Sequence, residues 1–176
     1  MRPDVEAAIG ARWRAVLIQG GLSRNGRFYP ADVLEAAAPR FNGAPVFVGH
    51  GAPVARERAT VGRVVDVRYE VFTDPRGRDW PQVVGTLEID DAETRASLLA
   101  WRQMRRRHLG VSAVMVVDSR SLTWDAADVW TWVTRITRVR SVDLVDHPAA
   151  GGRVLGIVTG GRGRVSPGAR GRMAAC

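Results

Sequence analysis

The segment HLGVSAVMVV, His108–Val117, decides the fold interpretation because it is the clearest candidate for a central strand. It is a short apolar run, rich in β-branched residues and free of proline, which is typical of a buried β-strand. Ser112 is its only hydroxyl-bearing residue, and a buried hydroxyl needs a hydrogen-bond partner. The partner is either a nearby backbone carbonyl or a histidine that would make Ser112 a nucleophile.

The sequence before this segment contains patterns that predict several strands and two helices. Apolar runs predict strands over 13–19, 44–50, 61–71 and 83–89, and a turn over 74–79 joins the last two. Asn25-Gly26 predicts a turn, with Arg24 and Arg27 in a structural role beside it. Pro30 and the alanine-rich segment after it predict a helix over 31–38. Acidic residues at the start and arginines at the end predict a helix over 91–107.

The chain after Val117 predicts a loop over 118–121, then strand-like runs over 122–124 and 129–145. A polar turn over 146–153 follows, and after it a last short strand or a helix turn over 154–158. Residues 1–158 are therefore expected to form one domain. Residues 159–176 are rich in Gly and Arg, and we expect them to form a disordered basic tail.

Sequential strands joined by turns favour a β-rich α+β fold. We expect a small closed antiparallel β-barrel with two or more peripheral helices. Regular alternation of strand and helix is missing, which argues against a doubly wound fold.

The composition limits the classes of function. All 26 basic residues are arginine, and the formal net charge is +8, which attracts acidic partners such as nucleic acid or acidic proteins. The single cysteine, Cys176, excludes a disulfide within one chain. We expect a soluble cytoplasmic protein, because the sequence contains neither a membrane-length apolar run nor a signal-peptide core. No metal or other cofactor is expected.

The chain contains three histidines, and two of them are candidates for acid–base chemistry. His108 follows three arginines at a predicted helix end, where it would cap carbonyls. His50 ends a short strand beside glycine and proline, so it should face a loop or a cleft. His147 lies in the polar turn. Asp143 lies in a strand, where it either pairs with an arginine or orients the imidazole that activates Ser112.

Three blocks in order resemble the phage prohead (capsid-maturation) serine protease family, which is related to the herpesvirus assembly protease. The first block is GLSRNGRFY, Gly21–Tyr29, running on to PVFVGH, Pro45–His50. The second is GVSA, Gly110–Ala113, and the third is SVDLVDHPAAGG, Ser141–Gly152. The resemblance covers about residues 13–155.

The resemblance implies a barrel protease with Ser112 as nucleophile and His50 as general base. The third member would be Asp143, as in the phage proteins, or His147, by analogy with the second histidine of the herpesvirus proteins. The turn that contains Gly151, Gly152 and Arg153 would stabilise the oxyanion, with a plain loop as the alternative.

The implied partners are the phage major capsid protein and the scaffold protein, as substrates inside the procapsid in the bacterial host cytoplasm. A homo-oligomer is compatible with this, a membrane is not expected, and nucleic acid would be incidental. The alternative function is a non-catalytic β-barrel that serves as an assembly or nucleic-acid-binding module of a phage particle.

Overall fold

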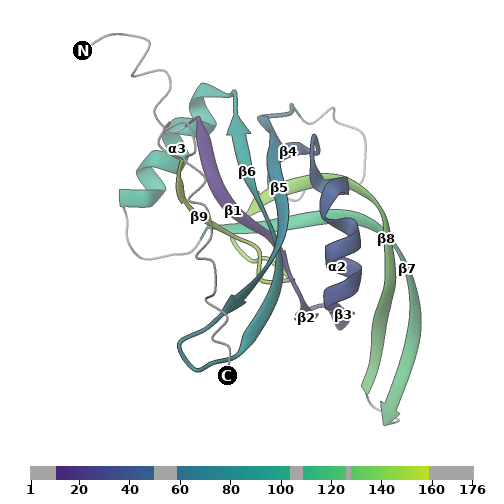
Figure 1. Cartoon of the computed structure of the whole chain (residues 1–176). Coiled ribbons are helices and arrows are strands. Elements are labelled where there is room, and N and C mark those ends of the chain that lie inside the picture. The colour runs from purple at the N-terminus through teal and green to yellow at the C-terminus, as the bar shows by residue number, and fades with distance from the viewer. Residues whose placement is uncertain (1–10, 50–58, 104–108, 126–127, 159–176) are drawn as a thin grey trace, which may run out of the picture.

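The structure, a computed structural model, describes residues 11–49, 59–103, 109–125 and 128–158 (Figure 1). The helices are α2 (Ala31–Ala37), the 3-10 helix η1 (Ala38–Phe41) and α3 (Ala92–Gln103). The strands are β1 (Arg12–Gln19), β2 (Gly21–Leu22), β3 (Arg27–Tyr29), β4 (Pro45–Val48), β5 (Gly62–Thr73), β6 (Asp79–Ile89), β7 (Gly110–Asp125), β8 (Asp128–Val145) and β9 (Arg153–Ile157).

Seven of these strands close into a barrel. Their order is β8-β4-β5-β6-β1-β9-β7, and β7 pairs with β8 to complete the ring. This confirms the small β-rich barrel with helices that the sequence predicts. The barrel is mixed rather than purely antiparallel, because β4 and β8 run parallel. A long stretch of chain separates these two strands, so no tight turn forces them to run in opposite directions.

Strands β7 and β8 continue beyond the barrel as a long curved hairpin arm, seen in green in Figure 1. The prediction of a loop over 118–121 is wrong. Strand β7 runs unbroken through these residues, and Asp118 pairs with Arg135 of β8. The residues there are polar because they are exposed, whereas Val133 of β8 opposite them is buried, and the ladder to β8 satisfies their backbone. Several register shifts along the pair account for its curvature. Strand β3 pairs parallel with Thr131 and Trp132 of β8, towards the hairpin end of the arm.

The core is a single apolar cluster that joins the barrel to α2 and η1. Trp13, Leu17, Leu34 and Phe41 are almost completely buried in it. Helix α2 buries the Leu34 side and lies between β5 and the β7–β8 arm (Figure 1). The helix predicted over 31–38 is thus confirmed to within one residue.

Helix α3 begins as the acidic residues before it predict. The backbone N–H of Thr94 donates to Asp91 Oδ2 at 2.7 Å, which caps the first turn. The hydrogen bonds to Thr94 lower the pKa of Asp91. The predicted end of this helix, 104–107, lies outside the described residues, as do the predicted tail and residues 1–10.

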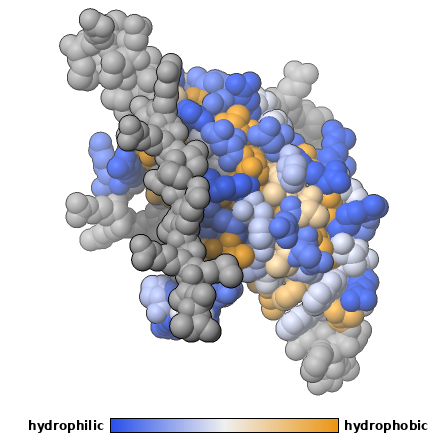
Figure 2. Space-filling view, in the orientation of Figure 1, coloured by the Kyte–Doolittle hydropathy of each residue, from blue (hydrophilic) through white to orange (hydrophobic). Residues whose placement is uncertain are grey.

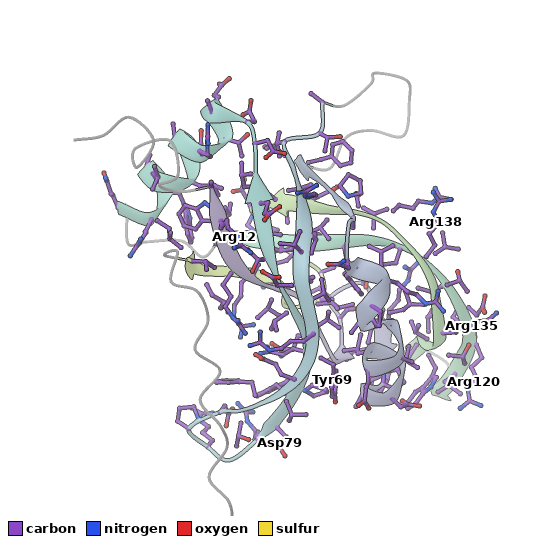
Figure 3. All side chains as sticks on the ribbon, turned by 45° about the horizontal axis from the view of Figure 1, so that its top comes forward. Arg12, Tyr69, Asp79, Arg120, Arg135 and Arg138 are labelled. Atoms are coloured by element: carbon purple, nitrogen blue, oxygen red, sulfur yellow. The ribbon has the colours of Figure 1, made fainter. Side chains whose placement is uncertain are left out.

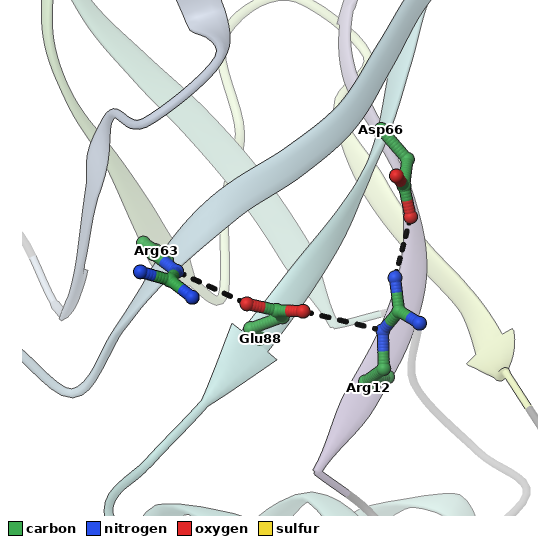
Figure 4. A network of polar contacts seen from close by, with 4 residues as sticks. All are labelled: Arg12, Arg63, Asp66 and Glu88. Carbon is green, nitrogen blue, oxygen red and sulfur yellow. Dashed lines mark hydrogen bonds and ion pairs between the residues drawn. The ribbon is translucent and has the colours of Figure 1, made fainter. Parts of the chain in front are cut away.

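Ion pairs link neighbouring strands on the outside of the barrel. Arg12 of β1 contacts both Asp66 of β5 and Glu88 of β6, and Glu88 also pairs with Arg63 (Figure 4). Asp66 and Arg63 are exposed and Arg12 and Glu88 are half-buried, so solvent screens the pairs and each contributes only about 0–1 kcal/mol. Hydrophilic and apolar residues are interspersed on the face shown in Figure 2. Within the described ranges, no helix has the length and apolarity needed to span a bilayer.

Candidate active site

Ser112 and Asp143 lie directly opposite each other on neighbouring antiparallel strands. The register of β7 on β8 pairs Ser112 with Asp143, next to the Val111–Leu144 pair. Opposed residues in such a ladder project from the same face, with Cβ atoms about 4.5–5.5 Å apart. The strands therefore hold a hydroxyl and a carboxylate side by side without any loop.

Asp143 is a buried acid, and only 1% of its surface is exposed. A carboxylate at this depth needs a hydrogen-bonding or electrostatic partner, and Asp143 has one. Ser112 is half-buried beside it. An acid inside the sheet and a more accessible hydroxyl next to it match the roles that a catalytic triad gives to its orienting group and its nucleophile.

Strand β4 lies on the other side of β8 and brings the chain to the residue before His50. Val48 pairs with Leu144, and the N–H of Gly49 donates to the Leu144 carbonyl at 2.8 Å. Gly49 has a φ of 71°, a left-handed conformation that ends the alternation of the strand. His50 itself lies outside the described residues, so its role as general base stays a prediction. What the structure brings together is Ser112, Asp143 and the chain position next to His50.

His147, the alternative third member, lies beyond the end of β8. It is exposed, and it lines a cavity of about 780 Å³ that also contacts Gly49 and α3. Ser112 lines a different and much smaller cavity. The strand register thus places Asp143, rather than His147, beside the hydroxyl.

The turn that contains Gly151, Gly152 and Arg153 packs between the ends of β1 and β7. The Arg153 guanidinium donates to Gln19 Oε1 at 3.1 Å and to the Gly151 carbonyl at 3.0 Å. Burial lowers the pKa of Arg153. None of these three turn residues lines the cavity at Ser112.

Gly152 allows a close backbone contact that could not be predicted from the sequence. A Cβ at Gly152 would lie 2.0 Å from the Val111 carbonyl oxygen, on the residue before Ser112. The Val111 N–H in turn donates to the Gly152 carbonyl at 3.1 Å. The glycine therefore permits a close backbone contact that fixes the start of β7.

The small cavity at Ser112 contains two polar residues that the sequence interpretation treated as structural. Asn25 and Arg27 line it together with Ser112 and Tyr29, in a volume of about 60 Å³. The Ser23 hydroxyl donates to Asn25 Oδ1, which leaves the amide nitrogen as the donor of that side chain. The Asn-Gly turn is evident in the sequence, but its position beside Ser112 depends on contacts distant in sequence, such as the Arg24 N–H to the Ala149 carbonyl.

Among the described residues, no cluster of His, Cys, Asp or Glu has the arrangement of a metal site. No family model, no curated protein and no solved structure matches this chain.

Proposed function

We propose that this chain is a serine endopeptidase of phage capsid maturation, which cleaves segments of the scaffold and major capsid proteins inside the procapsid. One observation carries the proposal: Ser112 of β7 and Asp143 of β8 are directly opposed, and β4, on the other side of β8, leads to Gly49, the residue before the predicted base His50. Neighbouring strands lie about 4.8 Å apart, so β7 and β8 hold the hydroxyl and the carboxylate within the span of a triad, and the chain position before His50 lies one strand further on.

The chemistry is an acyl transfer. His50 removes the proton of the Ser112 hydroxyl as the oxygen attacks the scissile carbonyl. The tetrahedral intermediate collapses when the imidazolium gives that proton to the leaving amine, which forms an acyl-enzyme. Water, activated by the same histidine, then hydrolyses the ester and restores the hydroxyl. Asp143 fixes the imidazole tautomer and stabilises the imidazolium.

The oxyanion of the intermediate needs hydrogen-bond donors close to Ser112. Asn25 and Arg27 are our candidates, because both side chains carry N–H donors and line the same cavity as Ser112. The turn that contains Gly151, Gly152 and Arg153 remains the second candidate, through its backbone N–H groups. Asn25 is held by Ser23, which gives it the fixed orientation that electrostatic stabilisation requires.

Co-expression with the capsid and scaffold proteins encoded beside the gene tests the proposal. Mass spectrometry should find defined fragments of one or both proteins with the wild-type chain and none with Ser112→Ala. Ser119→Ala, an exposed serine on the same strand, is the matched control and should cleave normally. Identical fragments with Ser112→Ala would refute the proposal.

A second candidate function, nucleic-acid binding by a non-catalytic module, is favoured by the β7–β8 arm. Arg120, Arg135 and Arg138 project from it (Figure 3), and a two-stranded ribbon fits the major groove of DNA. Arg135 is already paired with Asp118 at 2.7 Å, which reduces the charge available. Steeply salt-dependent DNA binding that is lost in Arg120→Ala/Arg138→Ala would support this function.

A further inference from the structure

A cavity of about 780 Å³ lies at the ends of β4 and β8 and against α3. Its volume is within the range of sites that bind ligands. The cavity contacts Leu144, the residue after Asp143, and Leu109, three residues before Ser112. At about 3.3 Å per residue, Leu109 lies about 10 Å along the strand direction from Ser112. Val145, two residues after Asp143 and on the same face of β8, also lines the cavity, so an extended peptide that follows this face from Ser112 would reach the cavity with a residue about three positions from the scissile bond.

The lining of this cavity combines an apolar wall with an acidic rim. Val61, Leu98 and Trp101 contribute apolar surface, and Leu98 is 97% buried, since only 3% of its surface is exposed. Asp91, Glu93 and Asp146 supply carboxylates and are exposed. Among the described lining residues, His147 is the sole basic side chain.

This charge pattern is the reverse of that of the whole chain. The protein has 26 arginines against 18 acidic residues, yet the described lining contains no arginine. Within the described ranges, no ion pair neutralises Glu93 or Asp146. Low-dielectric walls focus the field of such carboxylates into the cavity, where it attracts a cation.

We propose that this cavity is a substrate subsite for an arginine or lysine side chain of an extended peptide, about three residues from the scissile bond. The inference rests on the proposed function, which it deepens by naming the substrate class. A long basic side chain fits because its aliphatic stem packs against Leu98 and Trp101 while its charge stays at the acidic rim. The carboxylates of Glu93 and Asp146 then receive charge-assisted hydrogen bonds from the bound cation.

A cleavage assay on a mixed peptide library, read by mass spectrometry, tests this subsite. The wild-type enzyme should cleave peptides enriched in Arg or Lys at one fixed position, two to four residues from the cut. Glu93→Gln/Asp146→Asn should lose that enrichment, and Glu93→Arg/Asp146→Arg should favour acidic residues there. Asp32→Arg/Glu35→Arg, which changes the same charge on exposed positions of α2, should keep the wild-type preference.

A binding experiment separates failure of the subsite from failure of the proposed function. The Ser112→Ala protein should bind a fluorescein-labelled decapeptide with one arginine between leucines at least about tenfold more tightly than the same peptide with glutamate in its place. The neutral double variant should lose this difference. Library cleavage without a basic preference, or equal binding of both peptides, would overturn the subsite. Selective binding without any cleavage by the wild type would instead overturn the protease function and retain the cation-binding cavity.

Discussion

Ser112 and Asp143 form a directly opposed pair in the β7–β8 ladder, and Asp143 is buried there. The pair is set by strand register alone. A slip of one residue would turn one side chain to the other face and separate the hydroxyl from the carboxylate. The features that fix this register are therefore as important to the site as its functional groups.

Asp143→Asn should lower kcat by about 10⁴-fold while leaving the fold intact, because an amide would hold the imidazole in the wrong tautomer. His147→Gln should leave kcat within a few-fold of wild type, since His147 is exposed beyond the end of β8. Steady-state kinetics on a peptide cleaved by the wild type measures both. The reverse pattern would make His147 the third member.

Asn25→Ala should reduce kcat by about 10²–10³-fold with little change in KM, as expected when one oxyanion donor is removed. Asn42→Ala, an exposed asparagine after η1, is the matched control and should have no effect. If Asn25→Ala is fully active and replacement of Arg153 is not, the donors lie in the turn after β8.

Gly152→Ala should destabilise the protein by about 1–3 kcal/mol or more, because the new methyl group would overlap the Val111 carbonyl. Gly156→Ala, on the adjoining strand β9, meets no atom within 4 Å and should be almost neutral. Urea denaturation compares the two variants. Equal stability would show that the contact at Gly152 relaxes easily.

The hairpin between β5 and β6 should respond to acid through Asp74. Hydrogen bonds, foremost that from the Arg78 N–H, lower the pKa of Asp74 to about 2. Because the pKa is lower in the folded state than the ordinary value of about 3.9, the stabilisation is complete above about pH 4. It should be lost as the pH falls towards 2. An NMR titration of the carboxyl group measures this, and a midpoint near the ordinary value would contradict it.

The sequence predicted the barrel elements well because local patterns define them. Strand β1 and helix α2 have clear apolar periods and end signals, and both were found within a residue or two of their predicted bounds. The arm was missed at 118–121, because these residues of β7 are exposed, while the buried side chains of the arm at this level, Val133 and Ile136, belong to β8. The parallel pairing of β4 with β8 was missed because it depends on contacts that are distant in sequence.

The candidate site was predicted in part. Ser112 and Asp143 were named from a lone hydroxyl and a lone acid in apolar runs, and the register places them side by side. Asn25 and Arg27 were interpreted as a structural turn, since nothing local connects them to a strand more than 80 residues later. The acidic cavity could not be predicted from the sequence either, because its carboxylates come from two distant segments, the start of α3 and the end of β8.

Covalent labelling with a fluorophosphonate probe tests directly whether Ser112 is an activated nucleophile. An activated serine attacks phosphorus, expels fluoride and gains the mass of the phosphonyl group, which peptide mapping then locates. We predict one adduct per native chain, on Ser112, which is abolished in Ser112→Ala and strongly slowed in Asp143→Asn. A native protein that remains unlabelled, or one labelled only at another residue, would contradict it.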